Sequence, residues 1–372
     1  MINAMLAQEM ARRHDVTVLT SQGLDLPLEG VENGVRVVRV PVFFRKHKTV
    51  ANLLSMITFI LMGIRVGKKL LMTNRYDVIN THFVLPTGPV GNALSQFGKI
   101  PNVLTLHGGD LYDPSKFTSP HRHPLLRVWI KRLLRSADMV VGQSVNTLEN
   151  MRRYYTPEIN GVKIPLGIQR PKMDAACRRD YGFKEDEVLF VTVGRLVVRK
   201  AVNQLISMMD ASRNERVRLL IMGTGPQEET LKRESFKRQI EDKIVFMGHV
   251  EESEKFRILH MCDIYVSTSQ HEGFGLVFLE AMACGLPIVC YNHGGQTDFL
   301  EDTVTGYLLP LNDIEGFKDR CQGLIKDSAL RRRIGQENLQ RVEGFFIDRC
   351  AQRYEAIFEL AVNTFKKEGF SS

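Results

Sequence analysis

The stretch Ser267-Thr-Ser-Gln-His-Glu-Gly-Phe-Gly-Leu-Val-Phe-Leu-Glu-Ala-Met-Ala-Cys-Gly-Leu-Pro-Ile-Val-Cys290 decides the fold. An apolar strand, 264–267, is expected to run into the loop Glu272-Gly-Phe-Gly275. A helix is expected to begin near Leu276 and to end at a glycine that provides its left-handed cap. A strand, a glycine-bearing loop and a free helix N-terminus together present backbone N–H groups to an anion.

Two carboxylates bracket this expected anion site. Glu272 lies in the loop, where the helix dipole favours an acidic residue whether or not it has a function. Glu280 lies roughly one turn into a helix whose other residues, such as Phe278 and Leu279, are apolar. Because helical side chains lean towards the N-terminus, Glu280 can point back at a ligand in the loop. The dipole alone therefore explains Glu272 but not Glu280.

The same strand–loop–helix unit repeats on both sides of this stretch. Apolar runs alternate with helical patterns at short spacing, which is typical of parallel, doubly wound α/β sheets. The pattern loosens over 170–180, which reads as a linker. We therefore expect one Rossmann-like domain over 1–169, a second over 170–345, and a last helix, 346–372, that packs back towards the first domain. Expected strands are 16–20, 35–40, 77–82, 103–106, 139–142, 162–164, 188–193, 217–222, 244–247, 264–267, 288–290 and 306–309; expected helices are 2–13, 49–73, 87–96, 124–135, 146–155, 201–211, 226–240, 252–261, 276–284, 313–326, 328–341 and 346–366.

Composition places the chain among globular proteins. With 372 residues, 44% apolar and 25% charged, it is long enough for two domains. The six cysteines form no C-x-x-C pair, so we expect buried, reduced thiols in a cytosolic protein. Residues 1–166 carry 21 Lys and Arg against 11 Asp and Glu, a formal charge of +10. Such a half can attract an anionic membrane or an acidic substrate, or its charge can be incidental; it lacks the aromatic–basic interleaving of a nucleic-acid module.

Residues 49–73 show apolar residues at helical spacing between basic flanks. The sixteen uncharged residues from Thr49 to Ile64 fall short of the roughly 20 that span a bilayer. We interpret the segment as a packed helix, with a membrane-surface element as the alternative. The packed stripe is expected at positions 50, 53, 54, 57, 60, 61 and 64, with Met56, Phe59 and Met62 off that stripe.

The loops that follow the strands of the second domain carry groups that suit a nucleotide. Arg195 and Lys200 follow the strand 188–193, and together they offer a planar multidentate donor and a mobile point charge for a diphosphate. The alternative is a pair of solvated loop cations. Gly223-Thr-Gly-Pro226 lacks the further spaced glycine of a dinucleotide fingerprint and by itself predicts a tight turn. Gly248-His-Val250 would let backbone groups approach a flat base, but by itself it predicts nothing.

Taken together and in this order, the motifs resemble family 4 of the retaining glycosyltransferases with the GT-B fold. The resemblance rests on Gly194-Arg-Leu…Lys200, Gly223-Thr-Gly-Pro226, Gly248-His-Val250, Glu272-Gly-Phe-Gly…Glu280 and Gly294-Gly295, and His107-Gly-Gly-Asp110 looks like the family's H-G-x-D turn. It implies two Rossmann-like domains that face each other across a cleft. It also implies transfer of a sugar, with retained configuration, from a UDP- or GDP-type donor to a glycan, glycolipid or lipid-linked acceptor.

The resemblance also implies a role for each matching residue. Arg195 and Lys200 would clamp the diphosphate, and Glu280 would accept the ribose hydroxyls. Glu272 would contact the transferred sugar, and His107 would sit beside the anomeric carbon. For His82 we favour a hydrogen-bonded core residue over a direct contact. The implied catalytic set is His107, Glu272, Arg195 and Lys200; the donor-binding set is Arg195, Lys200, Gly223, Val250, Glu272, Gly273, Phe274, Gly275, Leu276 and Glu280; and the acceptor side is His82 and Asp110.

We expect no metal and no cofactor beyond the nucleotide sugar, in agreement with the absence of a D-x-D pair from the sequence. The family normally opens with a strand and a glycine-rich loop, whereas Met1 leads directly into a helix, without a signal peptide. A catalytically impaired nucleotide-sugar-binding partner or regulatory protein is therefore the alternative. Ala201, Leu166 and Asp298 stand where the family usually has glycine, asparagine and glutamate. We expect a cytoplasmic protein, with peripheral contact at the inner membrane face left open.

Overall fold

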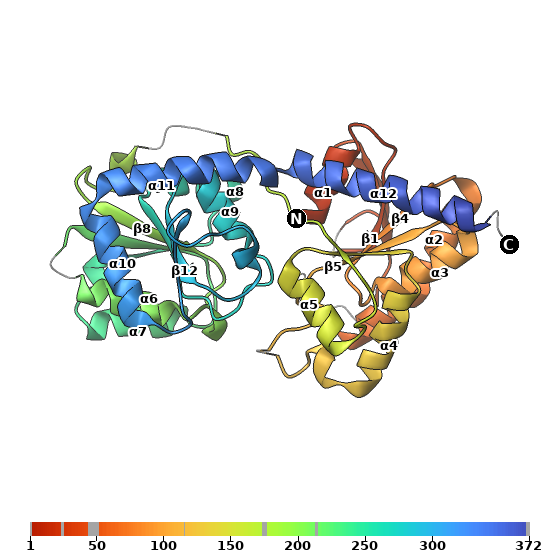
Figure 1. Ribbon diagram of the computed structural model, residues 1–372, viewed down its shortest axis with the longest axis horizontal. Helices are drawn as coiled ribbons and strands as arrows, with labels where there is room; N and C mark the ends of the chain where they lie inside the picture. Colours follow the sequence, from red (N-terminus) through yellow and green to blue (C-terminus); the bar gives the residue numbers. More distant parts are fainter. Residues whose placement is uncertain are drawn as a thin grey trace. The chain divides into compact units, whose positions relative to one another are not determined.

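A computed structural model describes residues 2–23, 26–43, 52–114, 116–172, 177–212 and 215–369 (Figure 1). The chain forms two compact units, which we call unit 1 (1–167 with 347–372) and unit 2 (168–346). In both units β-strands alternate with α-helices, so the predicted α/β class with two Rossmann-like domains is confirmed. The last helix, α12 (Ile347–Gly369), belongs to unit 1.

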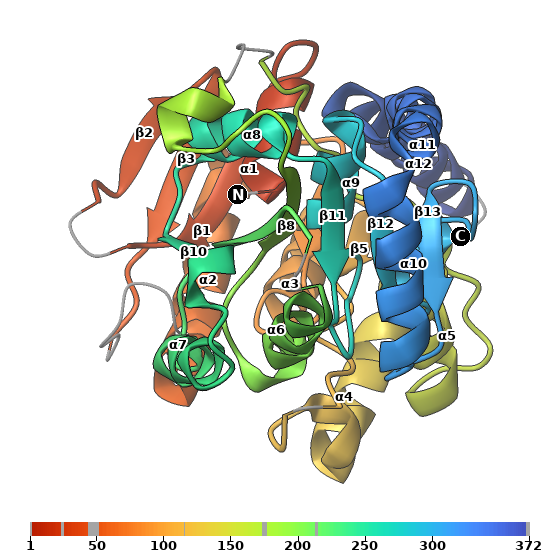
Figure 2. The same ribbon diagram turned by 90° about the vertical axis from the view of Figure 1, so that its left-hand side faces the viewer.

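Unit 2 contains one six-stranded sheet in the order β10-β9-β8-β11-β12-β13, in which every strand pair is parallel (Figure 2). Continuous apolar runs such as Val188–Val193 are typical of strands that are covered on both faces. The strands are β8 (Val188–Val193), β9 (Val217–Met222), β10 (Ile244–Gly248), β11 (Ile264–Ser267), β12 (Ile288–Tyr291) and β13 (Gly306–Leu309).

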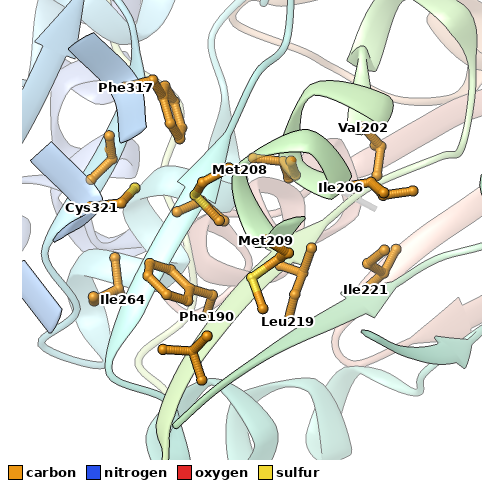
Figure 3. Close-up of a cluster of buried hydrophobic side chains, with 14 of the residues drawn as sticks. Phe190, Val202, Ile206, Met208, Met209, Leu219, Ile221, Ile264, Phe317 and Cys321 are labelled. Atoms are coloured by element: carbon orange, nitrogen blue, oxygen red, sulfur yellow. The ribbon is translucent and has the colours of Figure 1, made fainter. Parts of the chain in front are cut away.

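Helices cover this sheet and bury its apolar side chains. Met208 and Met209 of α6 and Phe317 of α10 pack with Phe190 and Leu219 of the strands (Figure 3). The helices are α6 (Val202–Ala211), α7 (Glu228–Lys237), α8 (Glu252–Met261), α9 (Leu276–Ala283), α10 (Ile314–Lys326) and α11 (Ser328–Arg341), with 3-10 turns at Arg178–Tyr181, Val198–Lys200, Glu241–Lys243, Gly295–Asp298 and Val342–Phe345.

Unit 1 contains two sheets instead of the single doubly wound sheet that the alternation predicts. One has the order β1-β3-β2 and the other β4-β5-β6-β7. Strand β2 is antiparallel to β3 and was missed, although Asn33-Gly34, with φ of 49° and 82°, forms the turn that favours a hairpin. The strands are β1 (Thr17–Ser21), β2 (Glu29–Glu32), β3 (Val35–Val40), β4 (Ile79–His82), β5 (Asn102–Leu106), β6 (Met139–Gly142) and β7 (Val162–Lys163).

The two sheets of unit 1 have differently buried strands. Every residue of β5 is buried, whereas every residue of β1 is only half-buried and β4 has one buried residue. Both β1 and β4 are edge strands within the described part of the chain. The helices of unit 1 are α1 (Ile2–Met10), α2 (Leu53–Thr73), α3 (Gly88–Gly98), α4 (Pro124–Arg135), α5 (Val145–Tyr154) and α12, with a 3-10 turn at Pro120–Arg122. Helix α1 ends at Met10, three residues before its predicted end at Arg13.

Helix α2 packs on a different face from the one predicted; residues 49–51 of the predicted helix lie outside the described residues. Ser55, Phe59, Gly63 and Gly67 are buried against unit 1, while Leu53 is 72% exposed and other residues of the predicted stripe also face solvent. The two glycines bring α2 close to α3, because a side chain at 67 would meet Leu94 at 2.5 Å. Within the described ranges, no helix combines the length and hydropathy needed to cross a bilayer.

Candidate active site

The donor-side residues predicted from the sequence lie in unit 2, in loops that follow its parallel strands. Gly194–Lys200 follows β8, Gly223–Gly225 follows β9, and Val250 comes just after β10. The loop with Glu272 follows β11 and leads into α9. Because the carboxyl ends of parallel strands meet at one edge of a sheet, these loops gather at that edge, where ligands of α/β proteins bind.

Three of the predicted residues, Arg195, Gly223 and Val250, line one cavity of about 420 Å³. Sequence reasoning did not assign a role to its other polar lining residues, Thr224, His249 and Lys255. Lys200 lies beside this cavity and lines a small hollow with Arg195 and Ser267. The cavity thus combines backbone of glycine turns with an exposed arginine and a buried lysine.

Glycine at position 223 is required by the close approach of two loops. Its φ is +138°, and a Cβ there would lie 2.0 Å from the carbonyl oxygen of Gly194. The Gly223 N–H donates to the carbonyl of Gly248 at 2.7 Å, which ties the β9 loop to the end of β10. The turn predicted at 223–226 therefore forms part of the cavity wall and brings backbone atoms next to any bound ligand.

Glu280 is held by a cation that the sequence analysis missed. Its side chain is buried, and its Oε1 lies 2.8 Å from Lys255 Nζ, which also lies 2.8 Å from Glu252 Oε1. Burial raises the pKa of Glu280, and the attraction of Lys255 offsets this only in part. Burial opposes the charge of Lys255, but Glu280 and Glu252 outweigh it and raise the pKa of Lys255. Glu280 Oε2 is buried and has no hydrogen-bond partner among the described residues.

The position of Lys255 on a predicted helix indicates in advance that it is buried. On α8, Lys255 lies three and four residues before Ile258 and Leu259, which are core residues. A lysine on the apolar stripe of a helix is rarely buried unless it is paired. Helical spacing alone therefore indicates a buried partner of opposite charge for Lys255.

Glu272 lies in a second set of ion pairs. Its carboxylate contacts Lys200 through Oε1, and its Oε2 lies 3.8 Å from Arg199. Arg199, which the sequence analysis gave no role, also donates to the carbonyl oxygen of His271. The Glu272 carbonyl accepts from the Gly295 N–H at 2.8 Å. Lys200, expected at the diphosphate, is thus bound to the carboxylate expected at the sugar.

The start of α9 lies directly after Glu272. Gly275 caps the helix with a φ of +90°, and Phe274 is buried against Phe299 at a centroid distance of 5.2 Å. The Phe278 N–H donates to the Gly275 carbonyl at 3.0 Å, whereas the amides of Leu276 and Val277 precede the first hydrogen bond of the helix. The predicted residues 273–276 thus form a fixed loop that leads into a helix N-terminus.

The three other predicted residues, His82, His107 and Asp110, lie together in unit 1. His82 Nδ1 is 3.1 Å from His107 Nε2, and Asp110 accepts from the backbone N–H groups of Val84 at 2.8 Å and His107 at 3.0 Å. Burial lowers the pKa of His82 to about 3, with a contribution from His107, and lowers that of His107 to about 4. Burial raises the pKa of Asp110 to about 6 despite its backbone hydrogen bonds. The expectation of a hydrogen-bonded His82 agrees with this geometry.

Comparisons with known proteins agree on one class. The description "Glycosyl transferases group 1" matches residues 174–341, and "Glycosyltransferase Family 4" matches residues 3–170. An uncharacterised glycosyltransferase of Methanocaldococcus jannaschii is 30% identical over 82% of this chain and 80% of its own. The chain therefore belongs to the group 1, family 4 glycosyltransferases and is a transferase enzyme.

Solved structures show the same fold. Sucrose-phosphate synthase from Thermosynechococcus elongatus superposes with a TM-score of 0.82 at 23% identity, covering 98% of this chain and 93% of that one. The protein HepE of Anabaena, solved in complex with UDP and glucose, gives a TM-score of 0.75 at 18% identity, covering 96% and 95%. The GT-B fold expected from the motifs is thus confirmed.

Proposed function

We propose that this enzyme transfers a sugar from a UDP- or GDP-type donor to a glycan, glycolipid or lipid-linked acceptor, with retained configuration and without a metal. The observation that carries the proposal is Glu280 Oε2, a buried carboxylate oxygen for which the described part of the chain offers no hydrogen-bond partner. Such an atom is costly unless a ligand donates to it. Its own ion-pair partner, Lys255, lines the cavity, so a ribose diol bound there would supply the missing donors.

In the proposed complex, the parts of the donor would follow one another along the cavity. The base would lie against Val250 and His249, the ribose at Glu280, and the diphosphate between Arg195 and the glycine turn at Gly223. The transferred sugar would then lie towards Glu272. The cavity itself is lined by the ends of β8, β9 and β10 and by Lys255 of α8, and the loop that precedes α9 lies outside its lining.

The arrangement also favours departure of the nucleoside diphosphate. Negative charge grows on the leaving group as the glycosidic bond breaks, and preorganised cations and amide dipoles lower that barrier. Arg195, Lys200 and the first turn of α9 supply these groups. In the proposed reaction they take the role that a divalent ion has elsewhere, and the sequence has no D-x-D pair for such an ion.

Of the two proposed donor types, UDP and GDP, the comparison with HepE, which was solved with UDP and glucose, supports UDP. Calorimetry with UDP and GDP tests the choice and the ribose assignment together. We expect Glu280→Ala to weaken nucleotide binding about tenfold or more, because two hydroxyl contacts to a carboxylate are lost. Glu252→Ala is the matched control, since it removes the other carboxylate from Lys255 but not the proposed ribose contact. Equal affinities for both variants would refute the assignment.

Product analysis tests the transfer itself. A retained anomeric configuration, seen by NMR of the product and unchanged by a chelator, is the expected result. Donor binding without either transfer or donor hydrolysis would instead favour the nucleotide-sugar-binding alternative. An inverted product would contradict the retaining mechanism while leaving the donor site intact.

The exposed face of α2 supports an acceptor at an anionic membrane surface, with the enzyme on the cytoplasmic side. Leu53, Ile57, Leu61, Arg65 and Lys69 follow one another at four-residue spacing and are all exposed, and α2 contains no acidic residue. Three apolar side chains followed by two cations along one exposed stripe, which winds around the helix, suit the boundary between acyl chains and anionic headgroups.

Vesicle sedimentation tests this membrane contact. We expect binding to vesicles with phosphatidylglycerol, little binding to pure phosphatidylcholine, and loss of binding in Ile57→Gln/Leu61→Gln. Leu339→Gln, at an exposed leucine of unit 2, is the control. Unchanged sedimentation of the double variant would contradict the role of α2 but not the transfer reaction.

A further inference from the structure

A chain of hydrogen bonds in unit 1 ends at His107. Tyr354 Oη of α12 donates to Thr105 Oγ1 at 3.3 Å, and Thr105 Oγ1 donates to Asn80 Oδ1 at 3.1 Å. Asn80 Nδ2 lies 3.0 Å from His82 Nε2, and His82 Nδ1 lies 3.1 Å from His107 Nε2. The five side chains come from α12, β5, β4 and the turn after β5, so distant parts of the sequence meet in one chain.

The direction of the first links follows from the proton inventory of each group. A threonine hydroxyl carries one proton, which Thr105 gives to Asn80 Oδ1 while it accepts from Tyr354. Burial raises the pKa of Tyr354, so its hydroxyl remains a donor. With its oxygen bound to Thr105, the Asn80 amide presents its NH2 group to His82. Thr105 thereby fixes which end of the amide faces the histidine.

The direction of the last links follows from the tautomers of the two imidazoles. His82 Nε2 accepts from Asn80, so the single proton of neutral His82 is on Nδ1. That N–H donates to His107 Nε2, and the proton of neutral His107 is therefore on Nδ1. His107 Nδ1 forms no hydrogen bond within the described part of the chain. It is a free N–H donor.

The surroundings of His107 hold the ring in this position. Phe83 stacks on it with a centroid distance of 4.0 Å and an interplanar angle of 22°, from a backbone with a φ of +69°. The backbone carbonyl of His107 accepts from Gln143 Nε2 at 2.7 Å, and the backbone N–H of His107 donates to Asp110. Asp110 accepts only from backbone N–H groups, and in the described ranges no hydrogen bond or ion pair joins a carboxylate to the imidazole of His82 or His107. Both rings thus remain neutral near pH 7.

We propose that Tyr354, Thr105, Asn80 and His82 are positioning residues that fix His107 as its Nδ1–H tautomer, so that His107 acts on the substrate as a hydrogen-bond donor and not as a base. The contact with substrate rests on the proposed transferase function, whereas the tautomer does not. A donor at this position binds an electron-rich oxygen, such as a sugar hydroxyl or the carbonyl or phosphoryl oxygen of a ligand. A base would instead require the lone pair that His82 occupies.

Long-range 15N–1H correlation spectra of the ligand-free enzyme, labelled at its histidines, report the tautomer directly. Loss of a ring pattern in His107→Phe assigns the signal. We expect the Nδ1–H pattern in the wild type and a shift towards Nε2–H in Thr105→Val, because the released Asn80 amide no longer orients His82. Thr81→Val is the matched control: Thr81 donates to Asn102 Oδ1 at 2.7 Å, a buried threonine–asparagine bond on β4 without a link to His107.

Kinetics supply the second readout. We expect Thr105→Val to lower kcat about tenfold with little change in KM for the donor, the size expected for one misdirected hydrogen bond, and Thr81→Val to leave kcat unchanged. An Nε2–H pattern in the wild type, an unchanged pattern in Thr105→Val, or an equal shift in Thr81→Val would each overturn the proposal. An Nδ1–H pattern in an enzyme without transferase activity would overturn the proposed function and leave the tautomer assignment standing.

Discussion

In unit 2 the strands form one six-stranded sheet and apolar side chains are mostly inside, whereas unit 1 divides its strands between two sheets and exposes many apolar side chains. Within the described ranges, the exposed large apolar residues of unit 2 are Val198, Phe236, Leu311 and Leu339, and all others belong to unit 1. The titratable groups differ as well. Unit 2 contains buried carboxylates beside lysines, while unit 1 contains half-buried histidines whose pKa values are lowered by desolvation.

Under the proposed function, the difference would correspond to two kinds of ligand, a nucleotide donor in unit 2 and an acceptor in unit 1. A nucleotide diphosphate always presents the same charged and hydroxyl groups, so a site with fixed, paired charges suits it. Acceptors differ among glycosyltransferases, and unit 1 has the exposed apolar and cationic surface that an amphipathic acceptor would require. The following experiments test this contrast, from the largest expected effect to the smallest.

Loss of the buried cation of unit 2 should have the largest effect. We expect Lys255→Met to lower the free energy of unfolding of unit 2 by roughly 3–5 kcal/mol, because Glu280 is left buried without its partner. Chemical unfolding followed by circular dichroism measures this change. Lys318→Met removes a pair with the exposed Glu315 and should cost less than about 1 kcal/mol.

The double variant Lys255→Met/Glu280→Gln tests whether the loss of stability comes from the unpaired charge of Glu280. It should recover part of the lost stability, because no uncompensated charge remains buried. If Lys255→Met cost no more than Lys318→Met, the view of unit 2 as a site built on buried ion pairs would be wrong.

Arg195 should affect the rate without affecting stability. It is exposed and forms no ion pair within the described residues, so Arg195→Ala should leave the unfolding curve unchanged. Turnover should fall about 10²–10³-fold if the guanidinium stabilises the leaving diphosphate. Arg332→Ala, at an exposed arginine of α11, is the control for a general loss of positive charge. Equal turnover of the two variants would remove Arg195 from the proposed site.

Acid should destabilise unit 1 through its neutral histidines. As the pH falls below about 6.5, the unfolded chain protonates both His82 and His107, whose pKa values in the folded state are about 3 and about 4. Stability is therefore lost as the pH falls. Asp110 opposes this loss below about pH 6, because its raised folded pKa makes the folded state take up that proton first.

The net loss between pH 7 and pH 5 should be about 2 kcal/mol, since two histidine protons outweigh one on Asp110. Trp129, the single tryptophan, lies in unit 1, so its fluorescence follows the unfolding of this unit. Asp110→Asn should make the loss with acid steeper. A stability of unit 1 that does not vary over this range would contradict the lowered pKa values of His82 and His107.

Close helix packing in unit 1 should give the smallest effect. A Cβ at Gly67 would meet Leu94 at 2.5 Å, whereas one at Gly63 would meet Val90 at 3.3 Å. We expect Gly67→Ala to destabilise unit 1 by about 1 kcal/mol, since overpacking exceeds the gain in helix propensity. Gly63→Ala should be nearly neutral. Identical Trp129 unfolding curves for the two variants would show that α2 moves freely on α3.

The sequence predicts unit 2 better than unit 1 for a physical reason. In unit 2, the predicted bounds agree with the structure for β8, β9, β11, β13, α8 and α11. The strands among these are found easily because buried parallel strands read as continuous apolar runs between glycine turns. In unit 1, β2 was missed because its residues, Glu29 to Glu32, carry two charges and one apolar side chain. The predicted packing face of α2 was wrong, because the face that packs contains Ser55, Gly63 and Gly67, which hydropathy does not mark as core residues.

The candidate site shows the same division. Motif residues at strand ends, such as Arg195 and Gly223, line the cavity because strand order places those ends together. The partner of Glu280 is on another helix, and no local spacing connects Lys255 with it. The hydrogen-bond chain to His107 depends on contacts between residues more than twenty positions apart, which the pattern of one segment does not contain.

Because β1 and β4 belong to different sheets, the backbone amides of unit 1 should differ in how fast they exchange with solvent. Each strand is hydrogen-bonded to a described strand on one side only, so alternate backbone amides along β1 and β4 point away from their sheets. In deuterated buffer we expect these amides to exchange with solvent much faster than those of β5, whose residues are all buried. Uniformly slow exchange along β1 would show that its outer edge is covered. An edge without a paired strand offers a template to any extended peptide that supplies the matching hydrogen bonds.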